Sequence, residues 1–475
     1  MKKNFGVAAL AGMSSLLLAL PVMAQDAPKI DTGDTAWVLT SSALVLLMTP
    51  GLAFFYGGLV RGKNALNTLM MSFVALGVIG VQWTVYGYSL AFSGGSPFLG
   101  GLTWLGLEGV GQAPNTDYSV TIPHLAFMVF QMMFAIITPA LISGAIVGRM
   151  KFKTYVVFIL LWATFVYDPV AHWVWSIWSV TGPDGKSVTM KGFLGAAGAL
   201  DFAGGTVVHI TAGVSALIAS IILGPRKGYG TAPMLPHNVP FVMLGAGLLW
   251  FGWFGFNAGS ALGANGVATQ AFITTNIATA AAMCVWLLLE AIFGKPSAVG
   301  GATGAVVGLV AITPAAGFVT PLSAIAIGAI AVVISYIAVQ LKKKTSIDDS
   351  LDVFSCHGLG GITGAILTGV FCTKSVNAAG ADGLLYGDPS QVLKQLYAVG
   401  VSITIAALGT AVIMIALKFT MGLRPSENEE MEGLDVAEHG EEAYIGLASG
   451  YSLIDEGAAQ SATFGKQVPG PAQQE

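Results

Sequence analysis

Residues 202–224 read FAGGTVVHITAGVSALIASIILG, a stretch without Asp, Glu, Lys or Arg. As a helix it would rise about 35 Å, and the hydrocarbon core of a bilayer is about 30 Å thick. Its glycine, alanine and serine residues are typical of membrane helices, because small side chains let neighbouring backbones approach closely. The stretch therefore predicts a membrane-spanning helix that packs tightly against its neighbours.

The composition extends this prediction to the whole chain. Only 10% of the 475 residues are charged and 54% are hydrophobic, whereas an ordinary soluble domain has roughly 25% charged residues. A soluble protein of this length could not cover its core with so little polar surface. The net charge of −4 is not gathered on a basic face, so we expect no nucleic-acid partner. We predict an all-α polytopic protein embedded in the lipid bilayer.

Apolar stretches of similar length recur, and we predict eleven transmembrane helices. They lie at 36–60, 66–92, 122–148, 154–179, 202–224, 239–262, 268–293, 298–318, 321–341, 353–373 and 392–417. The boundary between the eighth and ninth is weakly marked, because only the region from Pro314 to Pro321 separates them. With the mature N-terminus outside, every loop predicted to face the cytoplasm carries Lys or Arg, in agreement with the positive-inside rule.

The two ends of the chain differ from this apolar middle. Residues 1–24 are predicted to be a signal peptide, with Lys2 and Lys3 before an apolar run and a small-residue cleavage site at Ala24. Residues 25–420 form the predicted transmembrane domain, and 421–475 a polar cytoplasmic tail. We therefore expect the cell inner (plasma) membrane, with a periplasmic mature N-terminus and a cytoplasmic C-terminus.

Eleven helices allow two five-helix repeats of inverted topology plus a final helix. Polar residues support this arrangement. Asp201 opens the fifth span from outside, with His209 deeper in the membrane. Asp352 is expected to open the tenth span from inside, with His357 deeper. Each half would then end with an acid at the membrane edge and a histidine further in.

The two histidines are candidate pore residues, because ionisable groups inside a membrane are costly and usually functional. Facing imidazoles can share a proton and bind a passing solute, and desolvation favours their neutral form. The alternative is that each is structural and bonded to a backbone carbonyl. We interpret His172 in that structural way. The three cysteines have no spacing typical of a disulfide framework or metal site.

Aromatic residues form a second group. Phe130 and Phe134 lie four residues apart and so on one helix face, and Phe256 and Ser260 have the same spacing. Trp175 ends the fourth span on its outer side. We expect Trp175 and Ser260 at a wet mouth that suits a small cation, and the phenylalanines at a dry constriction below it. The alternative is that they are ordinary core and interfacial aromatics.

These stretches resemble motifs of the ammonium transporter (Amt) family of bacterial type. The resembling segments are DFAGGTVVH at 201–209, FGWFGFNAGS at 251–260, DVFSCHG at 352–358, GGLVRGKN at 57–64, FAIIT at 134–138 and GLDVAEHG at 433–440. The resemblance extends from about residue 36 to about residue 446. It implies ammonium transport rather than enzymatic activity, and no cofactor.

The resemblance also implies roles for single residues. His209 and His357 would be the paired pore histidines. The gate would consist of Phe130, Phe134 and Phe256, and the ammonium-binding site of Trp175 and Ser260, with Asp201 as its structural support. It further implies a homotrimer with one pore per subunit. A PII-type nitrogen-regulatory protein would dock on the cytoplasmic face.

The expected mechanism is capture of ammonium at the mouth, deprotonation at the gate, and passage of ammonia beside the histidines, because moving the charge through a dry pore would be costly. Three alternatives remain open: a Rhesus-type channel for neutral gas, an ammonium sensor, and a redox protein whose histidines bind haem. The segment from Gly182 to Gly198 is longer than the family usually has and is expected to face outside, away from the gate.

Overall fold

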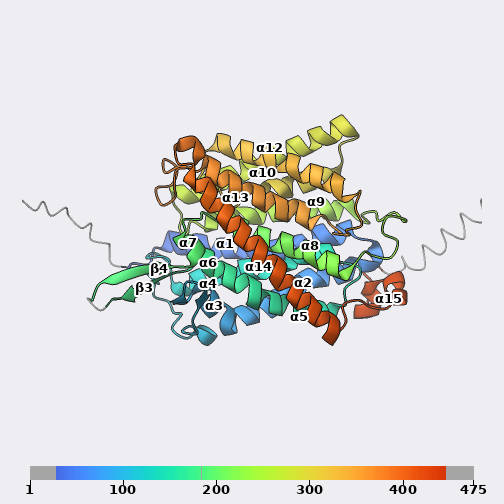
Figure 1. Cartoon of the computed structure of the whole chain (residues 1–475), viewed down its shortest axis with the longest axis horizontal. Coiled ribbons are helices and arrows are strands. Elements are labelled where there is room, and N and C mark those ends of the chain that lie inside the picture. Colours follow the sequence, from blue (N-terminus) through green and yellow to red (C-terminus); the bar gives the residue numbers. More distant parts are fainter. Residues whose placement is uncertain (1–27, 183–184, 445–475) are drawn as a thin grey trace, which may run out of the picture.

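The computed structural model describes residues 28–182 and 185–444, so the predicted signal peptide and the end of the tail lie outside the described residues. The described chain is a bundle of long helices lying side by side (Figure 1). Two small antiparallel hairpins, β1 (Gly95–Ser96) with β2 (Leu99–Gly100) and β3 (Ile177–Thr181) with β4 (Ser187–Lys191), are its only strands within the described ranges. The predicted all-α class is confirmed.

Short π-helical stretches, in which hydrogen bonds skip one residue more than in an α-helix, join or extend many of the helices. They are Trp83–Gly87, Ala163–Tyr167, Gly205–Ile210, Phe254–Ala258 and Phe354–Gly358. The α-helices in the first half are α1 (Thr32–Leu59), α2 (Ala65–Gln82), α3 (Tyr88–Phe92), α4 (His124–Ile146), α5 (Phe152–Trp162), α6 (Asp168–Trp175), α7 (Phe193–Ala196) and α8 (Thr211–Leu223). In the second half they are α9 (Val239–Trp253), α10 (Gly266–Phe293), α11 (Ala298–Ile312), α12 (Pro321–Lys342), α13 (Leu359–Phe371), α14 (Ser390–Thr420), α15 (Glu427–Glu432) and α16 (Leu434–His439).

Within the described ranges, ten helical segments are long and apolar enough to cross a membrane. The eighth predicted span is the exception. Its helix, α11, covers only Ala298–Ile312 and is followed by a turn. Its 15 residues rise about 22 Å, less than the thickness of a hydrocarbon core. The count of eleven spans therefore stays a prediction.

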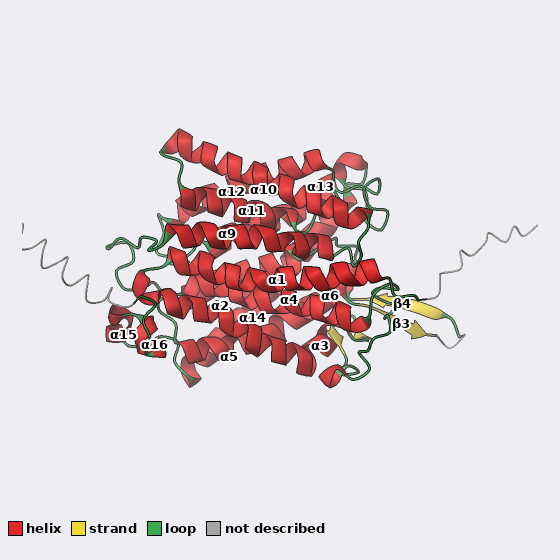
Figure 2. Cartoon of the chain, turned by 180° about the vertical axis from the view of Figure 1, so that it is seen from behind, coloured by secondary structure: helices red, strands yellow, loops and turns green. Residues whose placement is uncertain are grey.

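The two ends of the bundle carry different structures. The β3–β4 hairpin projects from one end, which we call the hairpin end, and α15 and α16 pack at the other, the tail end (Figures 1 and 2). The hairpin follows α6 directly, and its five residue pairs run from Ile177 with Lys191 to Thr181 with Ser187. The fourth predicted span, 154–179, is therefore too long at its end, because the helix stops at Trp175 and the chain continues as a strand.

Candidate functional site

The two predicted pore histidines face each other in the middle of the bundle. His209 lies in the π-helical stretch Gly205–Ile210 before α8, and His357 in Phe354–Gly358 before α13. Their Nδ1 atoms are 3.3 Å apart, their ring centroids 5.4 Å, and the ring planes 26°. Both side chains are almost completely buried. The rings are therefore close enough to share one hydrogen bond.

A hydrogen bond between the two rings determines which Nε2 atom is a hydrogen-bond donor and which is an acceptor in the small cavity that they line. If both are neutral, one Nδ1 carries a hydrogen and the other accepts it. The first ring then offers its Nε2 as an acceptor, and the second offers Nε2–H as a donor. Among the described residues, the buried His209 Nε2 has no hydrogen-bond partner. A small polar molecule passing through the lumen could supply that partner.

The close approach of the histidines depends on a contact between glycines. A Cβ atom added to Gly213 would lie 2.1 Å from the backbone nitrogen of Gly358. Gly213 is one helical turn after His209, and Gly358 follows His357 directly. The predicted role of the small residues in the 202–224 stretch is thus specific: they let the two histidine-bearing segments cross almost in contact.

A buried carboxylate orders the first histidine segment. Asp201 is 8% exposed and accepts hydrogen bonds from four successive backbone N–H groups, those of residues 204–207, at 2.7–3.1 Å. Burial raises the pKa of the Asp201 carboxyl, although the four N–H groups favour its charged form. Gly204 has φ +117°, a conformation that favours glycine. Asp201 thus satisfies the donors at the start of this helix.

The acid whose side chain caps the second histidine segment is Asp349. Asp352 lies at the start of this segment, as expected, and its backbone oxygen accepts from the Cys356 N–H at 2.9 Å, but its side chain does not cap the helix. Asp349 accepts from the backbone N–H groups of Val353 and Phe354 at 3.0 and 2.8 Å. It precedes His357 by eight residues, the spacing that separates Asp201 from His209. Asp352 instead pairs with Lys342 at 2.7 Å. Sequence inspection chose the acid nearest the apolar run, although the equal spacing could have identified the correct one.

The two histidine segments enter the bundle from opposite ends. The Trp175 indole N–H at the hairpin end donates to the backbone oxygen of Asp201 at 2.9 Å. Asp349 lies beside Asp348, which is bound by the guanidinium of Arg226 at the tail end through two hydrogen bonds of 2.8 Å. Helices α8 and α13 therefore run in opposite directions, as the inverted-repeat prediction requires.

Packed rings separate the histidines from the hairpin end. Phe134 and Phe256 have ring centroids 4.2 Å apart, and Phe130 contacts Phe134 edge to face at 5.0 Å. Phe134 also contacts Trp175 at 6.0 Å, and Phe256 contacts His209 at the same distance. All three phenylalanines are at most 1% exposed. The rings of Trp175, the three phenylalanines and the two histidines, predicted separately for mouth, constriction and pore, thus form one continuous series of contacts.

A cavity of about 160 Å³ lies on the hairpin side of these rings. It contains the two predicted substrate-binding residues, Trp175 and Ser260, and its walls are formed by Phe92, Asp117, Tyr118, Phe127, Gln131, Phe134, Trp175, Ile177, Phe202, Ser260 and Leu262. The Ser260 hydroxyl donates to the Phe256 carbonyl at 2.9 Å, so its oxygen lone pairs remain available as acceptors. Among the described residues, the Gln131 side-chain oxygen has no hydrogen-bond partner.

The cavity around the histidines is much smaller. Its volume is about 10 Å³, close to the minimum for a single water molecule. Apart from His209 and His357 its lining is apolar, and consists of Met48, Leu52, Phe55, Ile137, Leu141, Val208, Leu249, Trp253, Phe256 and Val306. It is therefore a narrow, almost dry cavity.

Sequence analysis missed Trp253 as a site residue. Its indole stacks on His209 with centroids 5.3 Å apart and planes at 18°, and its N–H donates to the Thr313 hydroxyl at 2.8 Å. The available signal was its position three residues before Phe256, which places both on one helix face.

His172 lies outside this path. Its ring nitrogens are 3.0 and 2.8 Å from the backbone oxygens of Ala91 and Ser96. These contacts agree with the structural interpretation.

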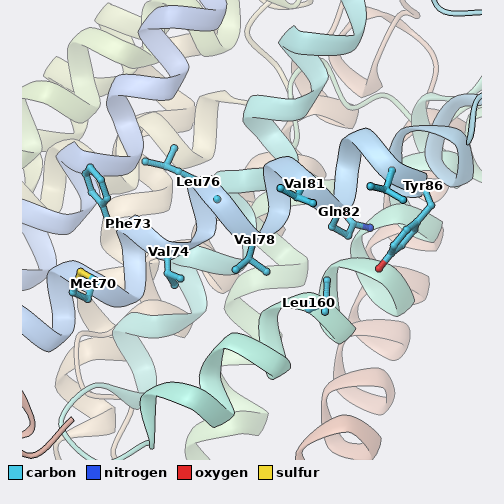
Figure 3. A pocket seen from close by; sticks show the side chains of 11 residues that line it. Met70, Phe73, Val74, Leu76, Val78, Val81, Gln82, Tyr86 and Leu160 are labelled. Carbon is cyan, nitrogen blue, oxygen red and sulfur yellow. The ribbon is translucent and has the colours of Figure 1, made fainter. Parts of the chain in front are cut away.

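Figure 3 shows a larger cavity, of about 830 Å³, on the flank of the bundle. Residues of α2 and the following π-helical stretch, with Leu160 of α5, line it, and none of the lining residues is Asp, Glu, Lys, Arg or His. Phe73 and Val81 are 53% and 64% exposed there. This apolar surface is typical of a lipid-facing flank and is separate from the path through the histidines.

Comparisons with known proteins give the same family as the motifs. A sequence model described as the Ammonium Transporter Family matches residues 36–444. An ammonium transporter of Bacillus subtilis is 51% identical over 87% of this chain and 98% of its own length. One of Aquifex aeolicus is 52% identical over 88% of this chain and 94% of its own.

Solved structures agree. Candida albicans Mep2 superposes with a TM-score of 0.77 at 36% identity, covering 87% of this chain and 91% of that one. A structure titled Sensor Amt Protein gives a TM-score of 0.76 at 30% identity, covering 86% and 98%. The chain belongs to the ammonium transporter family.

Proposed function

We propose that the protein takes up ammonium by capturing it at Trp175 and Ser260, removing a proton, and passing ammonia beside His209 and His357. The observation that carries this proposal is the series of contacts from a cavity of about 160 Å³, through three packed phenylalanines, to a passage of about 10 Å³ at the histidines. The series contains a wet compartment, a closed constriction and a dry polar passage in order.

The cavity of about 160 Å³ lined by Trp175 and Ser260, which we call the wet cavity, suits ammonium capture. An indole face attracts a cation with about 0.5–2 kcal/mol, depending on desolvation. Ammonium also has N–H groups to donate, and the oxygens of Ser260 and Gln131 can accept them. Asp201 supports the site without lining it, because its carboxylate is occupied by four backbone N–H groups and its carbonyl holds the Trp175 indole.

The constriction selects against charge. An ion entering so narrow a lumen would lose its water shell, at a cost of several kcal/mol or more. Ammonium can avoid this cost by giving one proton to water in the cavity and continuing as ammonia, whereas a potassium ion cannot. The gate formed by Phe130, Phe134 and Phe256 would open by ring movement for this small neutral molecule.

The histidine pair provides a polar lining inside the dry passage. One unoccupied Nε2 acceptor and one Nε2–H donor match ammonia, which both donates and accepts hydrogen bonds. The 3.3 Å separation of the two Nδ1 atoms leaves no room for an iron and its macrocycle between the rings, which argues against the haem alternative.

We further propose that the hairpin end faces the periplasm of a bacterial inner membrane and the tail end faces the cytoplasm. The predicted basic loops support this orientation. As part of the same proposal, the chain forms a homotrimer, residues 1–24 are a signal peptide, 25–420 the transmembrane domain and 421–475 the tail, and a PII-type nitrogen-regulatory protein docks at the tail end.

The described part of the tail offers a link to the transmembrane helices. The Asp435 carboxylate accepts from the backbone N–H groups of Leu66 and Asn67 at 3.0 and 2.7 Å, at the start of α2. Arg424 holds Glu430 through two hydrogen bonds of 2.7 and 2.6 Å. A regulator that displaced this segment would therefore act directly on the end of a membrane helix.

The test is to record current and internal pH of liposomes containing the purified protein after an ammonium jump. Capture followed by deprotonation predicts that ammonium uptake saturates with concentration and that potassium is not taken up. A non-saturating alkalinisation that follows only the ammonia concentration would instead indicate the Rhesus-type gas channel. Absence of uptake would refute transport and leave the sensor, the second candidate, which the likeness to the Sensor Amt Protein favours.

A further inference from the structure

The wall of the wet cavity contains one residue that the proposed mechanism has not used. Asp117 lies in the segment between α3 and α4 and lines the same cavity as Trp175, Phe134 and Ser260. Of the eleven residues lining that cavity, Asp117 alone is Asp, Glu, Lys, Arg or His. The cavity through which a cation would reach Trp175 is therefore bordered by a single formal charge, and that charge is negative.

The position of the Asp117 carboxylate is fixed by two contacts. Its Oδ1 accepts from the Ser179 hydroxyl on β3 at 2.6 Å, and its backbone N–H donates to the Asn115 side chain at 3.0 Å. The neighbouring Tyr118 hydroxyl donates to the Phe92 carbonyl at 2.5 Å. Among the described residues, the second carboxylate oxygen, Oδ2, has neither a hydrogen bond nor an ion pair. The carboxylate is thus held from one side and has a free oxygen.

The β3–β4 hairpin helps to position the Asp117 carboxylate. The hairpin begins two residues after Trp175, so β3 passes along the edge of the cavity. Ser179 is a cross-strand partner of Thr189, and pairing with β4 keeps β3 extended. The hairpin therefore holds the Asp117 carboxylate beside the cavity through Ser179.

We infer that Asp117 is a capture residue: its carboxylate attracts small monovalent cations into the cavity and raises their concentration next to Trp175 and Ser260. The inference rests on the proposed function and deepens it. Opposite charges attract each other more strongly beside a low-dielectric protein wall than in bulk water. Because a carboxylate that borders a partly enclosed cavity raises the local concentration of cations, removing it should weaken capture about tenfold.

The test compares matched variants in liposomes after ammonium jumps at low and at high ionic strength. Asp117→Asn keeps the shape and removes the charge, and Asp117→Glu keeps the charge. Glu108→Gln is the control, because Glu108 is an exposed acid in the same connection between α3 and α4 but does not line the cavity. Ser179→Ala leaves the carboxylate in place and removes only its fixing hydrogen bond.

At low ionic strength, Asp117→Asn is expected to raise the half-saturating ammonium concentration about tenfold with an unchanged maximal uptake rate. The difference should shrink at high ionic strength, because the screening length falls from about 30 Å at 0.01 M salt to about 3 Å at 1 M. Asp117→Glu and Glu108→Gln should behave like the unaltered protein, and Ser179→Ala should fall between it and Asp117→Asn.

Two outcomes would overturn the inference. One is an unchanged half-saturating concentration in Asp117→Asn while Trp175→Leu raises it; the proposed function would then stand and Asp117 would have no part in capture. The other is a lower maximal uptake rate in Asp117→Asn at an unchanged half-saturating concentration, which would make Asp117 structural. If Asp117→Asn does not fold, the half-saturating ammonium concentration of the unaltered protein and of Glu108→Gln is compared at low and high ionic strength. A half-saturating concentration that does not change with ionic strength refutes the inference. No ammonium-dependent uptake in the unaltered protein would instead contradict the proposed function.

Discussion

Replacing Gly213 with Ala is the sharpest test of the histidine pair, because it changes the spacing of the two segments without touching either ring. The added Cβ would lie 2.1 Å from the Gly358 nitrogen, and ordinary contact begins at 3.4 Å, so the backbones must separate by about 1.3 Å. His209 and His357 lie beside this contact, and their Nδ1 atoms are already 3.3 Å apart. A separation of that size would bring them to about 4 Å or more, beyond hydrogen-bond reach.

The expected energetic result has two parts. Alanine gains about 0.5–1 kcal/mol over glycine in a helix interior, whereas overpacking a close contact costs about 1–3 kcal/mol. We therefore expect a net loss of up to about 2 kcal/mol of stability. Transport should fall about tenfold or more, the equivalent of about 1.4 kcal/mol in the barrier.

Gly247 provides the matched control. It lies in α9, and a Cβ added there would meet nothing within 4 Å. Gly247→Ala should therefore leave transport unchanged and stabilise the helix slightly. The measurements are the uptake rate after an ammonium jump, followed by internal pH at equal protein density, and thermal unfolding in detergent. Normal uptake in Gly213→Ala, or an equal loss in Gly247→Ala, would refute the argument that close approach of the histidines is needed.

Four further results are expected. Trp175→Leu and Ser260→Ala should each raise the half-saturating ammonium concentration several-fold with folding intact, and unchanged concentration dependence in both would contradict a binding site in the wet cavity. His209→Asp should let potassium pass as a bare ion and carry current, because a carboxylate can stabilise a cation in the lumen, whereas His209→Ala should suppress ammonium uptake. Normal ammonium uptake that still excludes potassium in the Ala variant would make the histidine structural. Burial raises the pKa of the Asp349 carboxyl from its ordinary value of 3.8 to about 6. Between pH 3.8 and 6 the folded protein therefore binds more protons than the unfolded chain, and the contribution of Asp349 to the stability of the fold should fall as the pH rises through that range. Asp349→Asn should remove this part of the pH dependence of thermal unfolding. Truncation after Pro425 should lower or deregulate transport without preventing membrane insertion, and full activity with full regulator sensitivity would argue against coupling through the tail.

The helical fold was predictable because its main signal is local. A membrane helix needs about 20 apolar residues wherever it lies, so ten of the eleven predicted stretches coincide with long apolar helices. The failures occur where the chain leaves the membrane. The predicted fourth stretch includes residues after Trp175 that form a strand, and the predicted eighth stretch extends beyond Ile312, where α11 ends. Turn geometry and contacts with neighbours, rather than hydropathy, fix such ends.

The site was predictable in its residue types but not in its geometry. Helical spacing placed Phe130 with Phe134, and Phe256 with Ser260, on common faces. It could not reveal the π-helical stretches, which shift the following side chains around the helix axis and depend on unusual hydrogen bonding. Asp349 was missed although its eight-residue spacing to His357 repeats that of Asp201 and His209, because the acid nearest the apolar run was favoured. The capping role belongs to the carboxylate that reaches free N–H groups.

The proposed separation of capture from passage has a further physical consequence for selectivity. A single site cannot bind ammonium tightly and also release it rapidly into a dry lumen, because each favourable contact with the charge raises the free energy needed to leave the site. In this proposal the cation-stabilising groups, Trp175 and Ser260, line the cavity of about 160 Å³. Among the described residues, no acid lines the small cavity around His209 and His357. Potassium can occupy the first compartment as ammonium does, but it has no proton to give up. In this mechanism the affinity of the wet cavity sets the concentration at which transport saturates, and the ability to lose charge at the ring constriction decides which bound cation becomes a transported one.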